Sequence, residues 1–170
     1  MTCWRPGTAA RPKRPVASTL FAVAVLFALT LAPASRSIAQ APDVDQTAIR
    51  AALAKWTDAF NARNVEEVCS LFSTDLRYDY RGFPERNYKD ICGGLRRALT
   101  DRTKRYAYSL AVKDVLVSGD LAIVRLTWTL TVTKPHARPK VSHEPGIDVF
   151  KRQADGTWTI IRFLAYDEPG

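Results

Sequence analysis

The sequence predicts one α+β domain, in which three helices come first and lie on one face of a mostly antiparallel β-sheet. Apolar residues recur at helical spacing between residues 45 and 100, whereas residues 106–166 are rich in β-branched and aromatic residues. Two glycine-containing turns divide this second half into strands that follow one another closely. Short turns of this kind are typical of antiparallel hairpins.

Residues 1–39 precede this domain and have the pattern of a secretory signal. A basic head is followed by a 17-residue apolar run at 16–32 and by Ser37-Ile38-Ala39, which offers small residues at both positions that a signal peptidase reads. The run is at the short limit for spanning a bilayer, so an uncleaved membrane anchor is the alternative. We expect cleavage after Ala39, which leaves a domain of residues 40–170 that is periplasmic or secreted and has no stable membrane association.

The excess of positive charge belongs mostly to this leader. The chain has 25 Lys and Arg residues against 17 Asp and Glu residues, a formal net charge of +8. Five of the basic residues and none of the acidic ones precede residue 40, which leaves 20 basic residues against 17 and a net charge of +3. A charge this small on an exported domain does not indicate a nucleic-acid partner.

The first two helices are predicted from apolar spacing and from a capping residue. The first helix covers residues 45–62, and the second follows Asn64, which stands three residues before Glu67 in a capping-box arrangement. The apolar positions of the two helices are Ile49, Leu53, Trp56, Phe60, Val68, Leu71 and Phe72. These stripes predict the side of each helix that packs on the sheet.

A short strand and a third helix follow. Residues 76–80 alternate in polarity as a half-buried strand does, and Asn87 can cap a third helix. The apolar positions of this helix are Ile91, Leu95 and Leu99. Gly93-Gly94 weakens the helix without removing its pattern.

The remaining chain predicts two hairpins. Residues 106–117 and 121–133 are joined at 118–120, and residues 141–152 and 157–166 are joined at 154–156. Pro145 has no N–H to donate to a ladder, so we expect a bulge or a bend near it.

Cys69 and Cys92 are the cysteines that remain after cleavage. We expect them to form a disulfide, since an oxidising compartment favours one; two buried free thiols are the alternative. His136 and His143 are the only histidines, and no spacing of residues supplies a set of metal ligands or a phosphate-binding loop. We therefore expect neither a metal nor another cofactor.

The order of elements resembles the nuclear transport factor 2-like superfamily, whose cone-shaped fold is shared by SnoaL-like proteins and ketosteroid isomerases. The resemblance is carried by WTDAFNARNVEEVCSLF at 56–72, GDLAIVRLTW at 119–128, IDVF at 147–150 and DGTW at 155–158. It implies a curved sheet that forms a cone over nearly all of residues 40–170. It does not imply one function, because the superfamily contains isomerases, dehydratases, hydrolases and binding modules.

The resemblance to the isomerases keeps one of three catalytic positions. Asp148 matches the acid that holds the oxyanion, but Trp56 stands where a tyrosine would be and Tyr80 stands where the aspartate base would be. Trp56 has no acidic proton, and an ordinary tyrosine is a poor base at neutral pH. Asp79 has the right chemistry but points to the other face of its strand. Asp148 is therefore the candidate catalytic acid, and steroid isomerase activity is not implied.

Within this fold, Trp56, Phe60, Tyr80, Asp148 and Phe163 are expected to line the mouth of the cone. Apolar walls with few polar groups suit a small hydrophobic or flat ligand. The alternative is that the aromatic side chains fill the core and leave no cavity. By the resemblance, Asp148 is expected to be a buried acid with a raised pKa and a hydrogen-bonding neighbour.

The strand at 121–133 gives two conflicting orientations. Alternation turns the apolar set at even positions towards the helices. The resemblance to the isomerases instead turns Ile123 and Arg125 towards the pocket. An inward Arg125 would favour an anionic ligand, whereas an outward one would lie on the surface.

Three functions follow from these observations. The first is a binding module with a small-molecule pocket, the second is an enzyme of the isomerase or dehydratase kind that uses Asp148, and the third is a structural homodimer without ligand. Dimerisation through the sheet is expected because strict alternation gives the last strand apolar residues on both faces. One face would carry Trp158, Ile160, Leu164 and Tyr166, and the other Ile161, Phe163 and Ala165.

Overall fold

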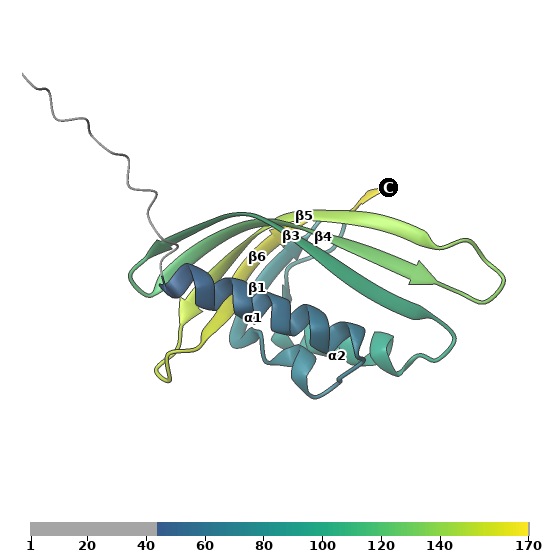
Figure 1. Ribbon diagram of the computed structural model, residues 1–170, viewed down its shortest axis with the longest axis horizontal. Coiled ribbons are helices and arrows are strands. Elements are labelled where there is room, and N and C mark those ends of the chain that lie inside the picture. The colour runs from purple at the N-terminus through teal and green to yellow at the C-terminus, as the bar shows by residue number, and fades with distance from the viewer. Residues whose placement is uncertain (1–43, 170) are drawn as a thin grey trace, which may run out of the picture. The chain divides into compact units, whose positions relative to one another are not determined.

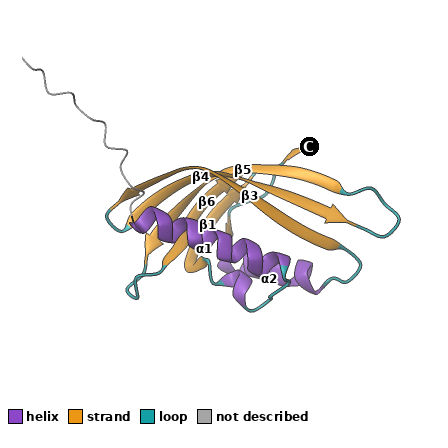
Figure 2. Cartoon of the chain, in the orientation of Figure 1, coloured by secondary structure: helices purple, strands orange, loops and turns teal. Residues whose placement is uncertain are grey.

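The computed structural model describes residues 44–169, so the predicted leader at 1–39 lies outside the described residues (Figure 1). Two α-helices and one short 3₁₀ helix lie on the same side of a curved, mixed sheet (Figure 2). The elements are α1 (Val44–Asn61), η1 (Glu67–Cys69), β1 (Phe72–Tyr80), β2 (Arg86–Asn87), α2 (Tyr88–Thr100), β3 (Arg105–Ser118), β4 (Leu121–Thr133), β5 (Lys140–Arg152), β6 (Trp158–Ala165) and β7 (Glu168–Pro169). No helix in this part of the chain is long and apolar enough to cross a membrane.

The predicted second α-helix is wrong. Its place is taken by the three-residue helix η1, and the chain then enters β1 at Phe72. Arg63 turns the chain sharply with a φ of 58°, and its guanidinium donates to the carbonyl of Leu99 in the last turn of α2 and to that of Lys104 beyond the end of α2. Asn64 accepts a hydrogen bond from the Glu67 backbone at 3.2 Å, as a cap does, but only one turn follows. These contacts hold the turn at Arg63 against the end of α2, and β1 begins three residues after η1 ends.

The third predicted helix is confirmed as α2. Its first residue follows Asn87, whose side chain accepts from two backbone N–H groups while Asp90 accepts from the Asn87 backbone, which makes a capping box. Cys69 and Cys92 form the expected disulfide, with their Cα atoms 5.6 Å apart. This bond joins η1 to α2.

The sheet has the order β2-β1-β6-β5-β4-β3, and β7 pairs with β5. Both predicted hairpins are confirmed, with Gly119 and Gly156 at positive φ in their turns. Among the strand pairs between residues 44 and 169, only β1 and β6 run parallel. Pro145 causes no bulge, since β5 stays in register with β4 there. On the other edge of β5, Pro145 lies opposite the gap between the end of β6 and the start of β7. No strand pairs with it there, so its missing N–H removes no ladder hydrogen bond.

A bulge does occur in β6, at Ile161. Phe150 pairs with Ile160, but the next residue back in β5, Val149, pairs with Arg162. The extra residue reverses the alternation of the strand beyond the bulge. Trp158, Ile160 and Phe163 therefore all face the inner side of the sheet. The strict alternation that we expected for this strand is wrong. Leu164 is 58% exposed on the outer face.

The strand β4 presents its even-numbered residues to the core. Val124 and Leu126 are buried, whereas Ile123 and Arg125 are exposed. The orientation taken from the isomerase resemblance is therefore wrong for Ile123 and Arg125, and the hydrophobic pattern is right. Asp148 pairs with Val124 and so lies on the inner face.

Candidate functional site

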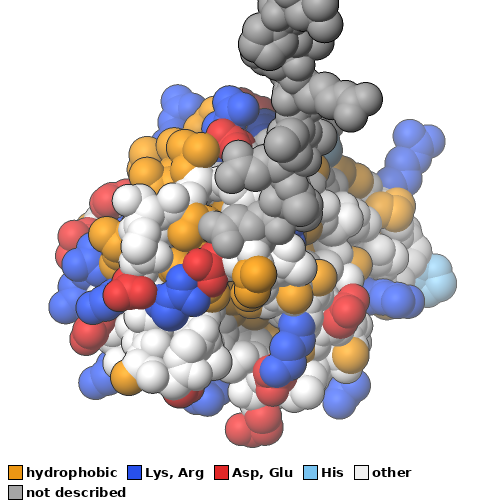
Figure 3. Space-filling model, turned by 60° about the vertical axis from the view of Figure 1, so that its left-hand side comes forward, with side chains coloured by type: hydrophobic (Ala, Val, Ile, Leu, Met, Phe, Trp, Pro, Cys, Tyr) orange, Lys and Arg blue, Asp and Glu red, His pale blue; other side chains and the backbone are white. Residues whose placement is uncertain are grey.

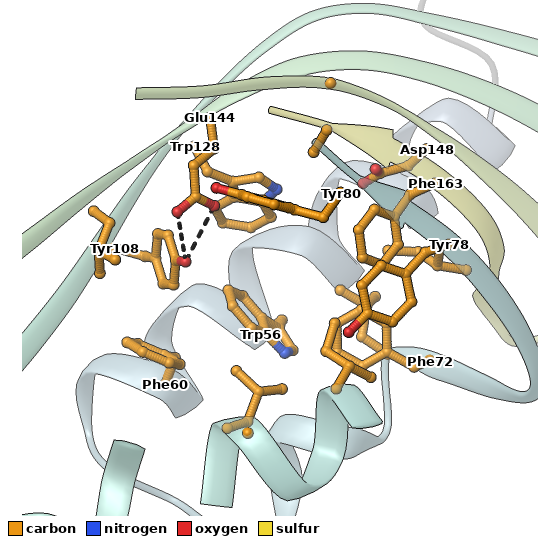
Figure 4. A pocket seen from close by; sticks show the side chains of 18 of the residues that line it. Trp56, Phe60, Phe72, Tyr78, Tyr80, Tyr108, Trp128, Glu144, Asp148 and Phe163 are labelled. Atoms are coloured by element: carbon orange, nitrogen blue, oxygen red, sulfur yellow. Dashed lines mark hydrogen bonds between the residues drawn. The ribbon is translucent and has the colours of Figure 1, made fainter. Parts of the chain in front are cut away.

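A cavity of roughly 360 Å³ lies between the inner face of the sheet and the helices α1 and α2 (Figure 4). All five side chains predicted for a pocket line it: Trp56, Phe60, Tyr80, Asp148 and Phe163. Trp56 and Phe60 also belong to the buried core, and Tyr80 and Phe163 pack against it, so these rings border the space and pack in the core at the same time. Because the lining includes β1, β3, β4, β5 and β6, the curvature of the sheet determines the size of the cavity.

Trp56 is at the centre of the aromatic wall. Its ring centroid lies 5.3 Å from that of Phe60, 5.6 Å from that of Tyr108 and 4.9 Å from that of Trp128. Its indole N–H donates to the carbonyl of Val68 at 2.8 Å. This donor is committed to the backbone, so Trp56 offers a ligand ring surface but no hydrogen bond. It does not replace the tyrosine of the isomerases.

Asp148 is 5% exposed and lies on β5 opposite Phe163. Burial raises its pKa from 3.8 to about 7. No group within residues 44–169 hydrogen-bonds or ion-pairs with its carboxyl group, so the expected hydrogen-bonding neighbour is absent from the described residues. A buried carboxyl group in this state favours the protonated form, which donates a hydrogen bond.

Glu144 is a second carboxyl group in the same cavity, and the sequence reasoning missed it. It lies four residues before Asp148 on the same face of β5, and the hydroxyl group of Tyr108 donates to its carboxylate, with O–O distances of 3.1 and 3.2 Å. Burial raises the pKa of Glu144 to about 7, although the hydrogen bond from Tyr108 opposes this rise. Counting back in steps of two from Asp148 would have found it, but the bulge or bend that we expected near Pro145 breaks this alternation.

Two tyrosine hydroxyl groups lie near Glu144. Burial raises the pKa of Tyr80 to about 12, and the charges of Glu144 and Asp167 add to this rise. Burial also raises the pKa of Tyr108 well above 10. Figure 4 shows the Tyr80 ring extending towards Glu144. Both tyrosines therefore act as hydrogen-bond donors near neutral pH, and neither is a base.

Asn61 fixes the position of Tyr108. Its side-chain amide donates to the Tyr108 carbonyl at 2.8 Å, and its oxygen accepts from the Tyr108 N–H at 2.9 Å. These two bonds join the end of α1 to β3. In the part of the chain that the structure describes, no three His, Cys, Asp or Glu side chains come together as metal ligands would. His143 instead contacts Thr129, with 3.0 Å between ring nitrogen and hydroxyl oxygen.

A family model described as a SnoaL-like domain matches residues 53–161 of the chain. The chain belongs to the SnoaL-like family. The match begins within α1 and ends within β6, so it includes every residue that lines the cavity except Phe163 and Ala165. A search of curated proteins found no match for this SnoaL-like chain.

Solved structures share the fold of this SnoaL-like domain. A conserved protein from Planctomyces limnophilus has a TM-score of 0.68 and 17% identity, over 74% of this chain and 98% of that one. A ketosteroid isomerase-like protein from Erwinia carotovora atroseptica has a TM-score of 0.62 and 18% identity, over 75% of this chain and 99% of that one. A proposed dehydratase of the NTF2-like family from Streptomyces avermitilis has a TM-score of 0.63 and 20% identity, over 76% of this chain and 99% of that one. At such low identity they show a common NTF2-like fold and not a common activity.

Proposed function

We propose that the cavity binds a small, largely apolar molecule with an oxygen atom that accepts a hydrogen bond from Asp148. The observation that carries this proposal is a buried carboxyl group without a partner among the described residues, in a cavity walled by aromatic rings. Ionised, such a group is costly to bury; protonated, it still lacks an acceptor for its hydrogen. A ligand carbonyl or ether oxygen supplies that acceptor.

The test compares 1-indanone with indane, which has the same rings but no oxygen. At pH 5.5, 1-indanone is expected to bind about fivefold more tightly, because one neutral hydrogen bond contributes about 1 kcal/mol. This preference weakens as the pH rises above about 7, where Asp148 loses its proton. Isothermal titration calorimetry measures both affinities.

Two variants separate the hydrogen bond from the titration. Asp148→Leu removes the donor and is expected to abolish the preference for the ketone. Asp148→Asn keeps a donor that does not titrate, so its preference stays constant with pH. A preference for 1-indanone that persists in Asp148→Leu, or no binding of either compound at millimolar concentration, contradicts the proposal.

A second candidate function is proton transfer of the isomerase or dehydratase kind. Glu144 supports it, because a base and an acid in one cavity are what such a reaction requires. We suggest the conversion of 3-cyclohexen-1-one to 2-cyclohexen-1-one as a minimal assay, followed by the ultraviolet absorbance of the conjugated ketone. An enzyme would lose this activity in both Glu144→Gln and Asp148→Leu. Binding without any conversion above the buffer rate would leave the binding function alone.

We also propose that the domain forms a homodimer through the outer face of its sheet. Exposed apolar side chains on this face support the proposal: Leu116, Leu121, Ile123, Ile147 and Leu164. Ile123→Lys would place a charge in the interface and is expected to convert the dimer to a monomer. Light scattering that gives a monomer mass for the wild-type protein at high micromolar concentration refutes this proposal.

We further propose that the domain acts after export. The small residues before position 40 and the disulfide between Cys69 and Cys92 both support an oxidising compartment outside the cytoplasm. N-terminal sequencing of the exported protein is expected to begin at or near Gln40. A chain that begins at Met1 in the membrane fraction contradicts this.

A further inference from the structure

The charged groups around the cavity are unbalanced. Asp90, Glu144 and Asp148 line it, and Arg86 is the one cationic side chain among the described lining residues. Asp90 accepts a hydrogen bond from the Asn87 backbone at 2.9 Å, so it is committed to the cap of α2. Arg86 lies 4.2 Å from the centre of the Phe83 ring. Among the described residues, no cationic side chain therefore balances the two carboxyl groups of β5.

Glu144 lies beside the densest group of rings in the cavity. Trp128 is its direct cross-strand neighbour on β4, and the Trp128 ring centroid lies 5.6 Å from that of Tyr108 and 4.9 Å from that of Trp56. Figure 4 shows Glu144, Trp128, Tyr80 and Tyr108 together on one side of the cavity, with Asp148 on the other. A carboxylate next to the faces of tryptophan and tyrosine rings is the combination that binds an organic ammonium group.

We propose that the Glu144 side of the cavity is a subsite for a protonated or quaternary amine. The ligand class is then a small apolar molecule with an ammonium group at one end and a hydrogen-bond acceptor at the other. The Cα atoms of Glu144 and Asp148 are about 13 Å apart, at roughly 3.3 Å per residue of strand, which sets the scale of the ligand. This inference rests on the proposed binding function and adds the charge of the ligand to it.

The subsite does not suit a metal ion. Glu144 is a single carboxylate with a tyrosine as its hydrogen-bond partner, and no cluster of three metal-binding side chains occurs between residues 44 and 169. A metal ion needs several convergent ligands. An ammonium group needs one carboxylate and ring faces, which are present.

The subsite also responds to pH. The groups that act on Glu144 from other elements are Tyr108 on β3, Tyr80 on β1 and Asp167 after β6, and none of them is cationic. Burial raises the pKa of Glu144 to about 7, so its negative charge develops as the pH rises from 6 to 8. A bound cation supplies the missing partner and favours the ionised form. Binding of a cation therefore becomes tighter over this pH range.

The test uses phenyltrimethylammonium and its uncharged isostere tert-butylbenzene. The ammonium charge is permanent, so any pH dependence of binding belongs to the protein. At pH 8 phenyltrimethylammonium is expected to bind the wild-type protein about tenfold more tightly than it binds Glu144→Gln. Glu66→Gln makes the same change of net charge at an exposed position outside the cavity and is expected to leave the affinity unchanged.

The wild-type protein alone gives a second measurement. Its affinity for phenyltrimethylammonium is expected to fall about tenfold between pH 8 and pH 5.5, while that for tert-butylbenzene changes little. Equal affinity of phenyltrimethylammonium for the wild type and Glu144→Gln, or no dependence on pH, overturns the inference. If tert-butylbenzene and 1-indanone bind but phenyltrimethylammonium does not, the amine subsite is overturned and the proposed binding function stands. If none of the three compounds binds, both proposals fail.

Discussion

The inner face of the sheet has two regions that the same elements build in different ways. The packed end consists of Ile49, Leu53, Val124 and Phe150, and all four are fully buried. The cavity end consists of Trp56, Tyr108, Trp128, Glu144 and Asp148, which line the open space. Along α1 the change comes between Leu53 and Trp56, and along β5 it comes between Phe150 and Asp148.

Side-chain shape explains part of the difference. At the packed end, branched aliphatic side chains and one phenyl ring fill the space between α1 and the sheet. At the cavity end, large rings meet at steep angles, such as 66° between Trp56 and Trp128. Rigid rings that contact one another at their edges brace the walls and leave a space between them. Helical spacing of apolar residues therefore predicts burial, but the residue type decides whether a cavity remains.

Charge differs in the same way. At the packed end Arg152 donates to both oxygens of Asp45, at 2.7 and 2.5 Å, and its guanidinium lies 4.5 Å from the centre of the Trp158 ring. Figure 3, which brings this end forward, shows side chains of both signs interspersed over the surface. At the cavity end two carboxyl groups lie inside without a cationic partner among the described residues. Two buried carboxyl groups without a cationic partner lower the stability of the fold, and such groups are typical of ligand-binding sites.

The largest predicted effect contrasts two phenylalanines of neighbouring strands. Phe150→Ala, at the packed end, is expected to lower the free energy of unfolding by about 3–5 kcal/mol, because it creates a void in a filled core. Phe163→Ala, at the cavity end, is expected to cost less than half as much, because its ring stacks on Tyr78 on one side and borders open space. Urea denaturation measures both. Equal losses would break the distinction between the two ends.

The next effect is the pH dependence caused by Asp148. Its pKa is 3.8 when unperturbed and about 7 in the folded protein. The folded state thus binds more protons than the unfolded state between these values, so the free energy of unfolding falls as the pH rises from about 4 to 7. Asp148 contributes at most about 4 kcal/mol to this fall. Asp148→Asn removes the contribution, so the variant gains stability relative to the wild type over this window.

Urea denaturation at pH 4, 5.5, 7 and 8.5 tests this prediction. The pKa of Glu144 is also raised, so the free energy of unfolding of Asp148→Asn still falls with rising pH, but by less than that of the wild type. Asp79→Asn is the matched control, because Asp79 is exposed on the outer face of β1, and its curve is expected to follow the wild type. Parallel curves for Asp148→Asn and the wild type would show that Asp148 is not buried as an acid.

The disulfide is expected to matter mainly for the cavity end. Its reduction should lower the free energy of unfolding by about 3 kcal/mol, given the 23-residue separation of Cys69 and Cys92. Ile91 and Leu95 of α2 line the cavity, so amides of α2 should lose protection from hydrogen exchange before those of β4 and β5. A double Cys→Ala variant, which cannot respond to reductant, is the control. Wild-type stability that is independent of reductant would contradict this prediction.

The smallest effect concerns the hydrogen bond between Tyr108 and Glu144. Tyr108→Phe removes a bond that lowers the pKa of Glu144, so this pKa is expected to rise above 7. The change should cost about 1 kcal/mol of stability at pH 8. Tyr106→Phe, another hydroxyl removal at a cavity-lining position, is the control. Carbon-detected NMR of the Glu144 carboxyl group measures the shift, and an unchanged midpoint would contradict it.

Much of the fold follows from local sequence signals. Asn87 and Asp90 stand at the spacing of a capping box, and Gly119 and Gly156 lie in short turns between β-rich segments, so α2 and both hairpins are predictable. The length of η1 is not predictable, because it depends on the positive φ of Arg63 and on contacts that Arg63 makes with distant carbonyls. Such tertiary contacts override local helix signals.

The candidate site was predictable only in part. Helical spacing predicted the burial of Trp56 and Phe60, whereas the family resemblance alone predicted Asp148 and placed the aromatic residues at a pocket. The bulge at Ile161 depends on pairing with β5, which no local pattern of β6 encodes. Glu144 was missed for a similar reason. Pro145 suggests that the strand is interrupted, and only the tertiary structure shows that Pro145 faces the gap between β6 and β7, where a proline fits into a continuous strand.

The most direct test of the account is the titration of Asp148 itself. With aspartate labelled by ¹³C at the side-chain carboxyl carbon, NMR spectra from pH 3 to 9 follow each group, and Asp148→Asn assigns the resonance. A midpoint of about 7, well above the ordinary 3.8, is expected for an acid buried without a partner. Addition of 1-indanone should raise this midpoint further, because the ketone accepts a hydrogen bond only from the protonated form. A midpoint at or below 3.8 that 1-indanone does not move would contradict the central claim.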